Sequence, residues 1–253
     1  MTAVVDPLGN RTEYTYNEFG QVLTVKDARN NTTRNFYDAK GNLIQTKDAL
    51  NNDTFYDYDS GGNMVSMLDA ENNLTTYSYD VYGNMLSQSQ CGAATTYTYD
   101  EGGNRMSETS PAPANIGGDV TARFEYDANG RLTKTIYAYG TALQTETSTI
   151  YDSLGKPVVR VDQKGRETET LYDDMGRPWK VTYPDGRYEV TEYDAEGRRV
   201  KQTQYYTAMI PRETRYEYDV MNRRIKRILP EGEEERYAYE RYSGLMDYKI
   251  DFN

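Results

Sequence analysis

Short segments of alternating polar and aromatic residues, separated by turn signals, follow one another along the whole chain. Thr12, Tyr14 and Tyr16 show the pattern Thr-x-Tyr-x-Tyr, which places all three side chains on one face of a β-strand. A turn signal follows every ten or eleven residues, which leaves roughly the length of one strand between turns. No segment shows a sustained helical period. The pattern predicts an all-β protein of antiparallel β-hairpins with less than about 10% helix.

One unit, a tyrosine followed by an acidic residue or asparagine and then by glycine three residues later, recurs from end to end with a step near 21 residues. We expect a single array over residues 1–253 of about eleven such units. Three loop insertions are expected to lengthen it, near residues 107–122, 137–149 and 203–213. The motif tyrosines are Tyr16, Tyr37, Tyr58, Tyr79, Tyr99, Tyr126, Tyr151, Tyr172, Tyr193, Tyr218 and Tyr239.

Each unit carries two turns, and their chemistry is readable. An aspartate at the first corner can accept hydrogen bonds from its own backbone two residues on. Glycine or asparagine then takes the left-handed conformation, which produces a hairpin with a bulge. The predicted left-handed positions include Gly41, Gly83, Gly130 and Gly197 after motif tyrosines, and Asn30, Asn51, Asn72 and Asn222 where asparagine replaces glycine.

The second strand of each unit has a less regular pattern. An apolar residue recurs seven positions after the motif tyrosine, but the residues around it do not alternate cleanly, so its sheet face stays unassigned. These residues are Leu23, Ile44, Val65, Leu86, Met106, Val158, Trp179, Val200 and Ile225.

Composition favours a thin sheet over a deep core. The 253 residues include 26 tyrosines but only 37% hydrophobic residues, and the mean hydropathy is −0.90. The net charge of −11 argues against nucleic-acid binding, since no broad cationic face would neutralise a phosphate backbone. Residues 1–126 carry 8 basic and 17 acidic residues, whereas residues 127–253 carry 21 and 23. No apolar run reaches the ~20 residues of a membrane helix, so membrane insertion is not expected, and no signal peptide is visible at the N-terminus.

The absence of histidine removes most hydrolytic chemistry, including Ser-His-Asp and Cys-His systems. Cys91 is the only cysteine, so no intramolecular disulfide forms, and no histidine or close lysine would activate its thiol. We therefore expect no catalytic, cofactor-binding or metal-binding residues, no cofactor, and a protein that is not an enzyme.

Several features nevertheless invite a functional reading. Adjacent carboxylates at Asp57/Asp59, Asp173/Asp174 and Glu233–Glu235 could act as an acid and a base, but chance adjacency among 40 acidic residues explains them better. The turn aspartates could bind calcium, but each turn offers one carboxylate, so turn capping is the preferred interpretation. The tyrosine rows could hold the sheet together by cross-strand pairing, or bind sugars or partly folded chains.

Tyr126-Asp127-Ala128-Asn129-Gly130-Arg131 and Asp6-Pro7-Leu8-Gly9-Asn10-Arg11-Thr12 resemble the YD repeat, also called the RHS repeat. This family includes bacterial Rhs polymorphic toxins, the C component of insecticidal toxin complexes, wall-associated proteins and teneurins. The resemblance implies a curved, spiralling sheet of antiparallel hairpins that forms a shell around a C-terminal toxin. Asp6-Pro7-Leu8-Gly9 also resembles the family's self-cleavage signature, but we interpret it as an ordinary repeat turn.

The resemblance implies a non-catalytic shell segment that encloses a polypeptide cargo, and the sequence is expected to be a piece of a longer protein. The alternative is a cell-surface adhesion or carbohydrate-binding module. Expected partners are a toxin or other polypeptide, carbohydrate in the alternative, and further copies through unpaired edge strands. The expected location is exported, secreted or at the cell surface, as part of a larger bacterial protein.

Overall fold

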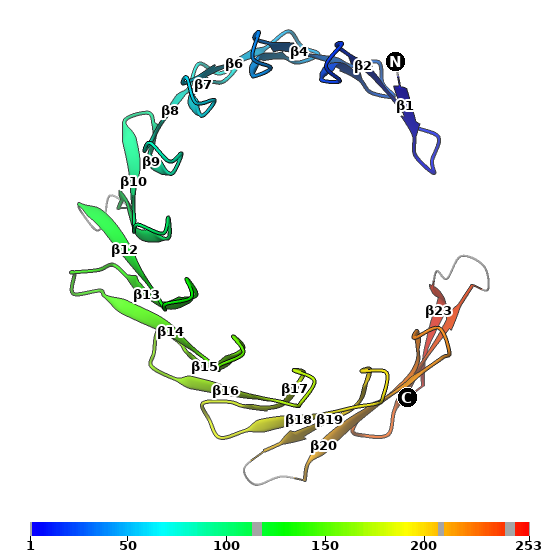
Figure 1. Ribbon diagram of the computed structural model, residues 1–253. Coiled ribbons are helices and arrows are strands. Elements are labelled where there is room, and N and C mark those ends of the chain that lie inside the picture. The colour runs from blue at the N-terminus through cyan, green and yellow to red at the C-terminus, as the bar shows by residue number, and fades with distance from the viewer. Residues whose placement is uncertain (1, 113–117, 207–209, 241–245, 253) are drawn as a thin grey trace. The chain divides into compact units, whose positions relative to one another are not determined.

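The protein is described from a computed structural model that covers residues 2–112, 118–206, 210–240 and 246–252. This part of the chain contains 23 strands and no helix (Figure 1), so the predicted all-β array of antiparallel hairpins is confirmed. Within the same residues there is no helix of the length and apolarity needed to cross a membrane.

The chain divides into two compact units, which are described separately. The first comprises residues 1–130 and 137–144, and the second comprises residues 131–136 and 145–253. The first unit holds β1 (Thr2–Val5), β2 (Arg11–Tyr16), β3 (Val22–Lys26), β4 (Thr32–Tyr37), β5 (Leu43–Lys47), β6 (Asp53–Tyr58), β7 (Met64–Leu68), β8 (Leu74–Tyr79), β9 (Met85–Gln90), β10 (Ala93–Tyr99), β11 (Arg105–Pro111) and β12 (Asp119–Tyr126). The second holds nearly all of β13 (Leu132–Tyr137), then β14 (Thr145–Tyr151), β15 (Pro157–Val161), β16 (Glu167–Tyr172), β17 (Pro178–Thr182), β18 (Tyr188–Tyr193), β19 (Arg199–Tyr205), β20 (Arg212–Tyr218), β21 (Arg224–Ile228), β22 (Glu234–Tyr239) and β23 (Met246–Phe252).

Hairpins closed by the turn after a motif tyrosine, here called tyrosine turns, contain a β-bulge. In the β4–β5 hairpin Phe36 pairs with Gln45 and Tyr37 pairs with Leu43, so Ile44 is the extra, unpaired residue. The same shift recurs in nine other tyrosine-turn hairpins, from β2–β3 to β22–β23. The recurrent apolar residue seven positions after the tyrosine is therefore the bulge residue, and this is why the second strand does not alternate regularly.

Neighbouring hairpins meet over a shorter stretch. Strands β3 and β4 pair only from Thr24↔Arg34 to Lys26↔Thr32, beside the other turn of the unit, here called the second turn. The same three-pair contact joins β5 to β6, β7 to β8, β15 to β16, β17 to β18 and β21 to β22. Towards the tyrosine turns, the backbones of adjacent hairpins are no longer paired. Figure 1 shows the hairpins of the first unit following a curved path.

The predicted turn conformations are confirmed. Gly41, Gly83, Gly130 and Gly197 have φ of 90°, 87°, 74° and 83°. Asn30, Asn51, Asn72 and Asn222 have φ between 62° and 67°. Non-glycine residues in this region are uncommon, and asparagine is one of the few that tolerates it.

The sheet has almost no interior. Among the described residues only Ile136, Tyr216, Thr75, Thr135 and Thr203 are buried, and each keeps 2–8% of its surface exposed. The motif tyrosines and the residues two and four positions before them share one face, here called the tyrosine face. Stability therefore depends on strand pairing and on contacts between half-buried side chains of adjacent hairpins, as in other repeat proteins.

The three predicted insertions stay a prediction, and their residues fall at the following places between the strands. Residues 107–122 extend the β11–β12 hairpin, which pairs from Ser107↔Arg123 to Pro111↔Asp119, and residues 113–117 lie outside the described residues. Residues 203–213 include the end of β19, the start of β20 and the connection between them, of which 207–209 likewise lie outside the described residues. Residues 137–149 include the turn between β13 and β14. One array over residues 1–253 stays a prediction.

Candidate functional site

The motif tyrosine joins each hairpin to the one before it. The hydroxyl of Tyr37 in β4 donates to the carbonyl of Val22 in β3, at 3.0 Å. That carbonyl lies beside the bulge, where the backbones of adjacent hairpins have separated. The same hydrogen bond, of 2.7–3.0 Å, recurs at Tyr58, Tyr79, Tyr99, Tyr126, Tyr151, Tyr172, Tyr193, Tyr218 and Tyr239. A phenol is therefore required at this position because its hydroxyl bonds a carbonyl that the sheet leaves open.

The turn aspartate forms a closed hydrogen-bond network within its own turn. Asp38 accepts the backbone N–H groups of Lys40 and Asn42 on Oδ1, both at 2.8 Å, and the amide of Asn42 on Oδ2 at 2.9 Å. These donors, led by the Asn42 side chain, lower the pKa of Asp38. The arrangement explains turn capping, and the described residues hold no group of three or more potential metal ligands from His, Cys, Asp and Glu.

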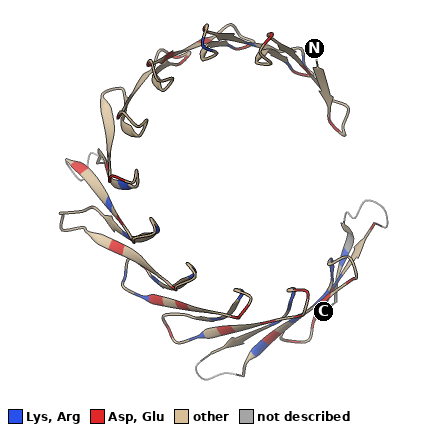
Figure 2. Cartoon of the chain, in the orientation of Figure 1, with Lys and Arg blue, Asp and Glu red and all other residues tan. Residues whose placement is uncertain are grey.

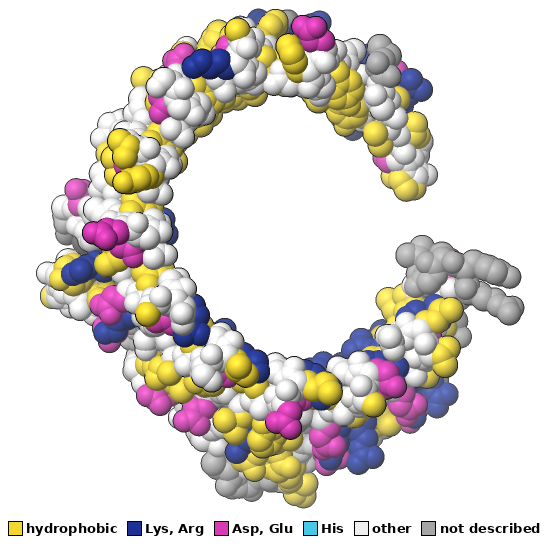
Figure 3. Space-filling model, viewed as in Figure 1, with side chains coloured by type: hydrophobic (Ala, Val, Ile, Leu, Met, Phe, Trp, Pro, Cys, Tyr) yellow, Lys and Arg dark blue, Asp and Glu magenta, His cyan; other side chains and the backbone are white. Residues whose placement is uncertain are grey.

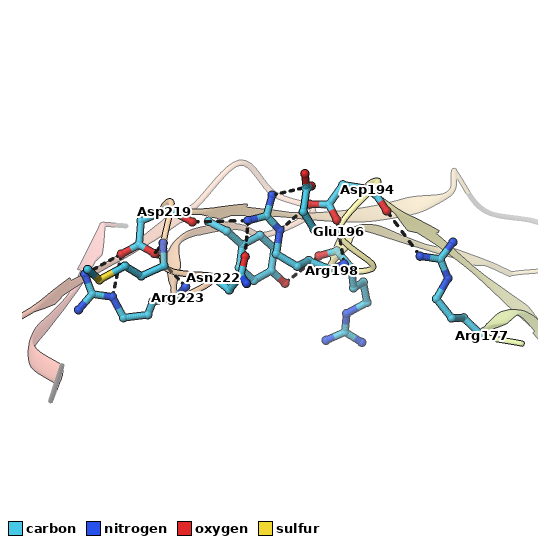
Figure 4. A network of polar contacts seen from close by, with 10 residues as sticks. Arg177, Asp194, Glu196, Arg198, Asp219, Asn222 and Arg223 are labelled. Carbon is cyan, nitrogen blue, oxygen red and sulfur yellow. Dashed lines mark hydrogen bonds and ion pairs between the residues drawn. The ribbon is translucent and has the colours of Figure 1, made fainter. Parts of the chain in front are cut away.

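The residue after the turn glycine reaches towards the next hairpin, and its type differs between the units. In the first unit it is glutamine or asparagine; Gln21, for example, donates to the carbonyl of Gly41 at 2.7 Å. In the second unit it is arginine or lysine. Arg198 bonds the carboxylate of its own turn at 2.6 Å and reaches Asn222 Oδ1 of the next tyrosine turn at 2.9 Å (Figure 4).

These cations also lie over tyrosine rings. The guanidinium carbons of Arg177, Arg198 and Arg223 lie 4.5, 5.1 and 4.7 Å from the centroids of the next motif tyrosines, Tyr193, Tyr218 and Tyr239. A cation over a tyrosine ring is attracted to it by about 0.5–1 kcal/mol at an exposed site. The tyrosine turns of the second unit thus form a ladder of aspartate, arginine and tyrosine, whereas the first unit uses neutral amides. Figure 2 shows that the strands of the second unit also carry more charged residues than those of the first.

A small pocket lies between β18 and β19, beside the second turn that joins β17 to β18. Its lining includes Tyr183, Glu189, Gln204 and Tyr206, and its volume is about 130 Å³. Gln204 donates to the Glu189 carboxylate at 2.8 Å, and Gln202 donates to its other oxygen at 2.7 Å. On the other sheet face of the same strands, Tyr188 and Tyr205 stack with centroids 4.4 Å apart.

This sequence is matched by a family model, described as Teneurin YD-shell, over residues 10–198. That match covers about three quarters of the chain. The chain belongs to the teneurin YD-shell family. No curated protein matches it.

Solved structures share the YD-shell fold. A crystal structure of TcdB2-TccC3-Cdc42 superposes with a TM-score of 0.78 and 16% identity, covering 96% of this chain and 14% of that one. A crystal structure of TcdB2-TccC3 gives 0.76 and 17%, covering 94% and 14%. The Tc holotoxin pore of Photorhabdus luminescens, with a TccC3 mutation, gives 0.59 and 18%, covering 98% and 15%. The chain thus spans about one seventh of the length of these solved chains.

Most of the candidate carboxylates of the sequence are engaged in local contacts of their own. Asp57 lies on the exposed face of β6 and accepts the Ser66 hydroxyl, whereas Asp59 caps the following turn. Glu234 pairs with Lys226, and Glu235 accepts Tyr237. Asp173 caps its turn by accepting the backbone N–H of Arg177, at 2.8 Å, while Asp174 is exposed beside it.

The remaining candidates are ordinary turn residues. Asp6 accepts the backbone N–H groups of Leu8 and Asn10 and the side chain of Asn10, and Gly9 has φ of 83°. Cys91 is exposed in the tight turn between β9 and β10, with φ of 51°. The absence of catalytic, cofactor and metal residues stays a prediction. Sequence reasoning missed the role of the residue after the glycine, although its change from amide to cation accounts for part of the charge difference between the two halves.

Proposed function

We propose that this YD-shell chain is a non-catalytic wall segment that encloses a polypeptide. The observation that supports this most strongly is the ten-fold recurrence of the tyrosine junction, with a 2.7–3.0 Å hydrogen bond each time. The aspartates of the tyrosine turns accept hydrogen bonds from their own turns, and ten of the eleven motif tyrosines, all but Tyr16, donate to the preceding hairpin. The recurrent side chains therefore build a wall, and none of them is left to form a nucleophile with an orienting base.

The titles of the related structures name toxin complexes of TcdB2 with TccC3, and one of them also contains Cdc42. By analogy, the wall formed here holds a toxin or another polypeptide, and the protein acts outside the cell that makes it.

Protection from protease tests the proposal. The polypeptide that carries this sequence is isolated from its source cells and digested with trypsin, before and after the wall is unfolded in urea. Enclosed cargo stays intact in the native protein and is cleaved once the wall unfolds. A control with the same cargo expressed alone must be cleaved in native buffer. Equal cleavage of the cargo in both native samples would contradict enclosure.

Carbohydrate binding is the second candidate, and the pocket of Tyr183, Glu189, Gln204 and Tyr206 favours it. Its volume of about 130 Å³ is near the ~150 Å³ of an apolar cavity that binds benzene, so it admits one six-membered ring. Aromatic rings beside a fixed carboxylate and amides are typical of ligand sites. Chemical-shift changes at these residues on titration with monosaccharides would support it, and Tyr206→Ala should abolish them. No shift at millimolar sugar would exclude it.

A further inference from the structure

Two arginines on the tyrosine face of the second unit have no carboxylate partner. Arg199 in β19 pairs with Tyr193, and Arg224 in β21 pairs with Tyr218, so both lie on that face. Neither forms an ion pair with a described residue; Arg199 donates only to the amide oxygen of Gln202, at 3.3 Å. By contrast, the neighbouring Arg198 forms an ion pair with its own turn aspartate at 2.6 Å.

Aromatic stacking fixes both guanidinium groups. Tyr216 in β20 lies between the two strands, with Arg199 at 4.7 Å and Arg224 at 6.0 Å from its ring centroid. Arg224 also lies 4.6 Å from the ring of Tyr237 in β22. Tyr216 is only 7% exposed as a result. Stacking covers the flat faces of a guanidinium and orients it before a ligand arrives. The Nε of Arg224 is buried without a hydrogen-bond partner, so a ligand would meet the terminal NH2 groups of that side chain.

The fold does not need a charge at this repeat position, which lies two residues after the turn glycine. The first unit has Val22, Leu43, Met64 and Met85 there, and the hairpins pair in the same way. Arg105 at the same position stacks on Phe124 at 4.9 Å, but Glu108 neutralises it at 3.1 Å. Covering an aromatic ring therefore explains the side-chain volume of Arg199 and Arg224, and leaves their charge unexplained.

The carboxylates on the same face do not compensate the charges of Arg199 and Arg224, because they pair with other cations. On the same face, Arg212 has its own partner in Glu231, and Glu235 is shared between Arg227 and Lys249. Figure 3 shows Lys and Arg side chains gathered over the strands of the second unit. A cationic pair stands out in a chain whose net charge is −11.

We propose that Arg199 and Arg224 form a docking site for an acidic segment of a polypeptide, with one carboxylate on each guanidinium. Guanidinium N–H edges match carboxylate geometry. The two residues lie two strands apart, roughly 10 Å. A peptide in the polyproline II conformation spans this distance with acidic side chains three residues apart, because that helix has three residues per turn and rises about 3.1 Å per residue. The inference rests on the proposed function, since it names the chemistry of the enclosed chain. Nucleic acid fits this site less well, because nucleic-acid-binding proteins typically contact about six or more phosphates and this site offers only two arginines.

Fluorescence anisotropy on the isolated 253-residue chain tests the site. The probe is a labelled peptide with glutamate at every third position and glycine and serine between, and the reference peptide has glutamine in place of glutamate. The variant is Arg199→Met with Arg224→Met, which uses the residue that Met64 and Met85 show to be compatible with the fold. Arg105→Met is the matched control, since it makes the same substitution at the same repeat position in a neutralised arginine. Circular dichroism establishes that each variant folds.

The glutamate peptide should bind the parent chain, and the double variant should raise its dissociation constant about tenfold. Arg105→Met should change it by less than about twofold. Three results would each contradict the proposed site. They are a loss of affinity in Arg105→Met equal to that in the double variant, binding of the glutamine peptide as tight as that of the glutamate peptide, and binding of an oligonucleotide tighter than that of the glutamate peptide. If the peptide does not bind but the cargo is still protected from trypsin, the acidic docking site is wrong and the proposed enclosing function stands. If the peptide binds but the cargo is not protected, the proposed enclosing function is wrong.

Discussion

Removing the hydroxyl of one motif tyrosine measures how much its hydrogen bond to the preceding hairpin contributes to the free energy of unfolding. Tyr79→Phe deletes the hydrogen bond from Tyr79 in β8 to the carbonyl of Met64 in β7, which is 2.9 Å long, and keeps the ring. A typical hydrogen bond contributes about 0.5–1.5 kcal/mol net, and an acceptor left unsatisfied adds a desolvation cost. Because the Met64 carbonyl is only partly buried, we expect a loss of about 1 kcal/mol in the free energy of unfolding.

Tyr77→Phe is the matched control. Tyr77 lies two residues earlier on the same face, and its hydroxyl has no hydrogen-bond partner among the described residues. Its loss should cost less than about 0.5 kcal/mol. Replacing Tyr37, Tyr58 and Tyr79 together should cost about 3 kcal/mol, because the three junctions are roughly 10 Å apart and should add.

Urea unfolding followed by far-UV circular dichroism gives these free energies, and hydrogen exchange locates them. Exchange should accelerate in β7, β8 and the hairpins beside them, since repeats contact only their neighbours. Equal effects of Tyr79→Phe and Tyr77→Phe would refute the junction, because the hydroxyl would then act through solvation alone.

Three further predictions concern the turns. Arg198→Asn installs the residue type of the first unit. It should lower the midpoint of the same urea melts, and sodium chloride should destabilise the parent chain more than the variant. Gly83→Val should lower the free energy of unfolding by about 1–2 kcal/mol in thermal melts, because Gly83 has φ of 87°. Gly83→Asn should lower it clearly less, since asparagine tolerates this conformation. Similar losses in the two variants would contradict the left-handed conformation of this residue. Amide and guanidinium donors lower the pKa of the turn aspartates, to about 2 at Asp162. Their contribution to stability is complete above about pH 4 and is lost as pH falls through the folded pKa, so circular dichroism should show unfolding towards pH 2 and no step between pH 5 and 8.

The turns could be predicted from the sequence because their chemistry is local. Asp38, Gly41 and Asn42 contact one another within five residues, so the pattern of side chains carries the whole geometry. The tyrosine junction could not be predicted in the same way, since it joins Tyr37 to a backbone carbonyl 15 residues earlier. A backbone acceptor leaves no trace in side-chain identity.

The bulge could be predicted only in part from the sequence. Its signal was present, since the strand containing Ile44 loses its alternation, but lost alternation alone does not identify the extra residue. The stack of Arg199 and Arg224 on Tyr216 depends on three strands meeting, and it appears only once register is known. The sequence did indicate that the fold needs no charge at this repeat position, since methionine occupies it in other units.

The three-pair contact between hairpins also affects how such a chain can change length during evolution. Six neighbouring hairpin pairs share this three-pair contact, so a duplicated or deleted stretch of 21 codons among them would present the same contact to both neighbours. Recombination between two copies of the repeat within one gene would then lengthen the protein by whole hairpins without disturbing register. The step of 20 residues from Tyr79 to Tyr99, where the tight Cys91-Gly92 turn replaces a longer one, shows that the contact between hairpins also tolerates a shortened unit.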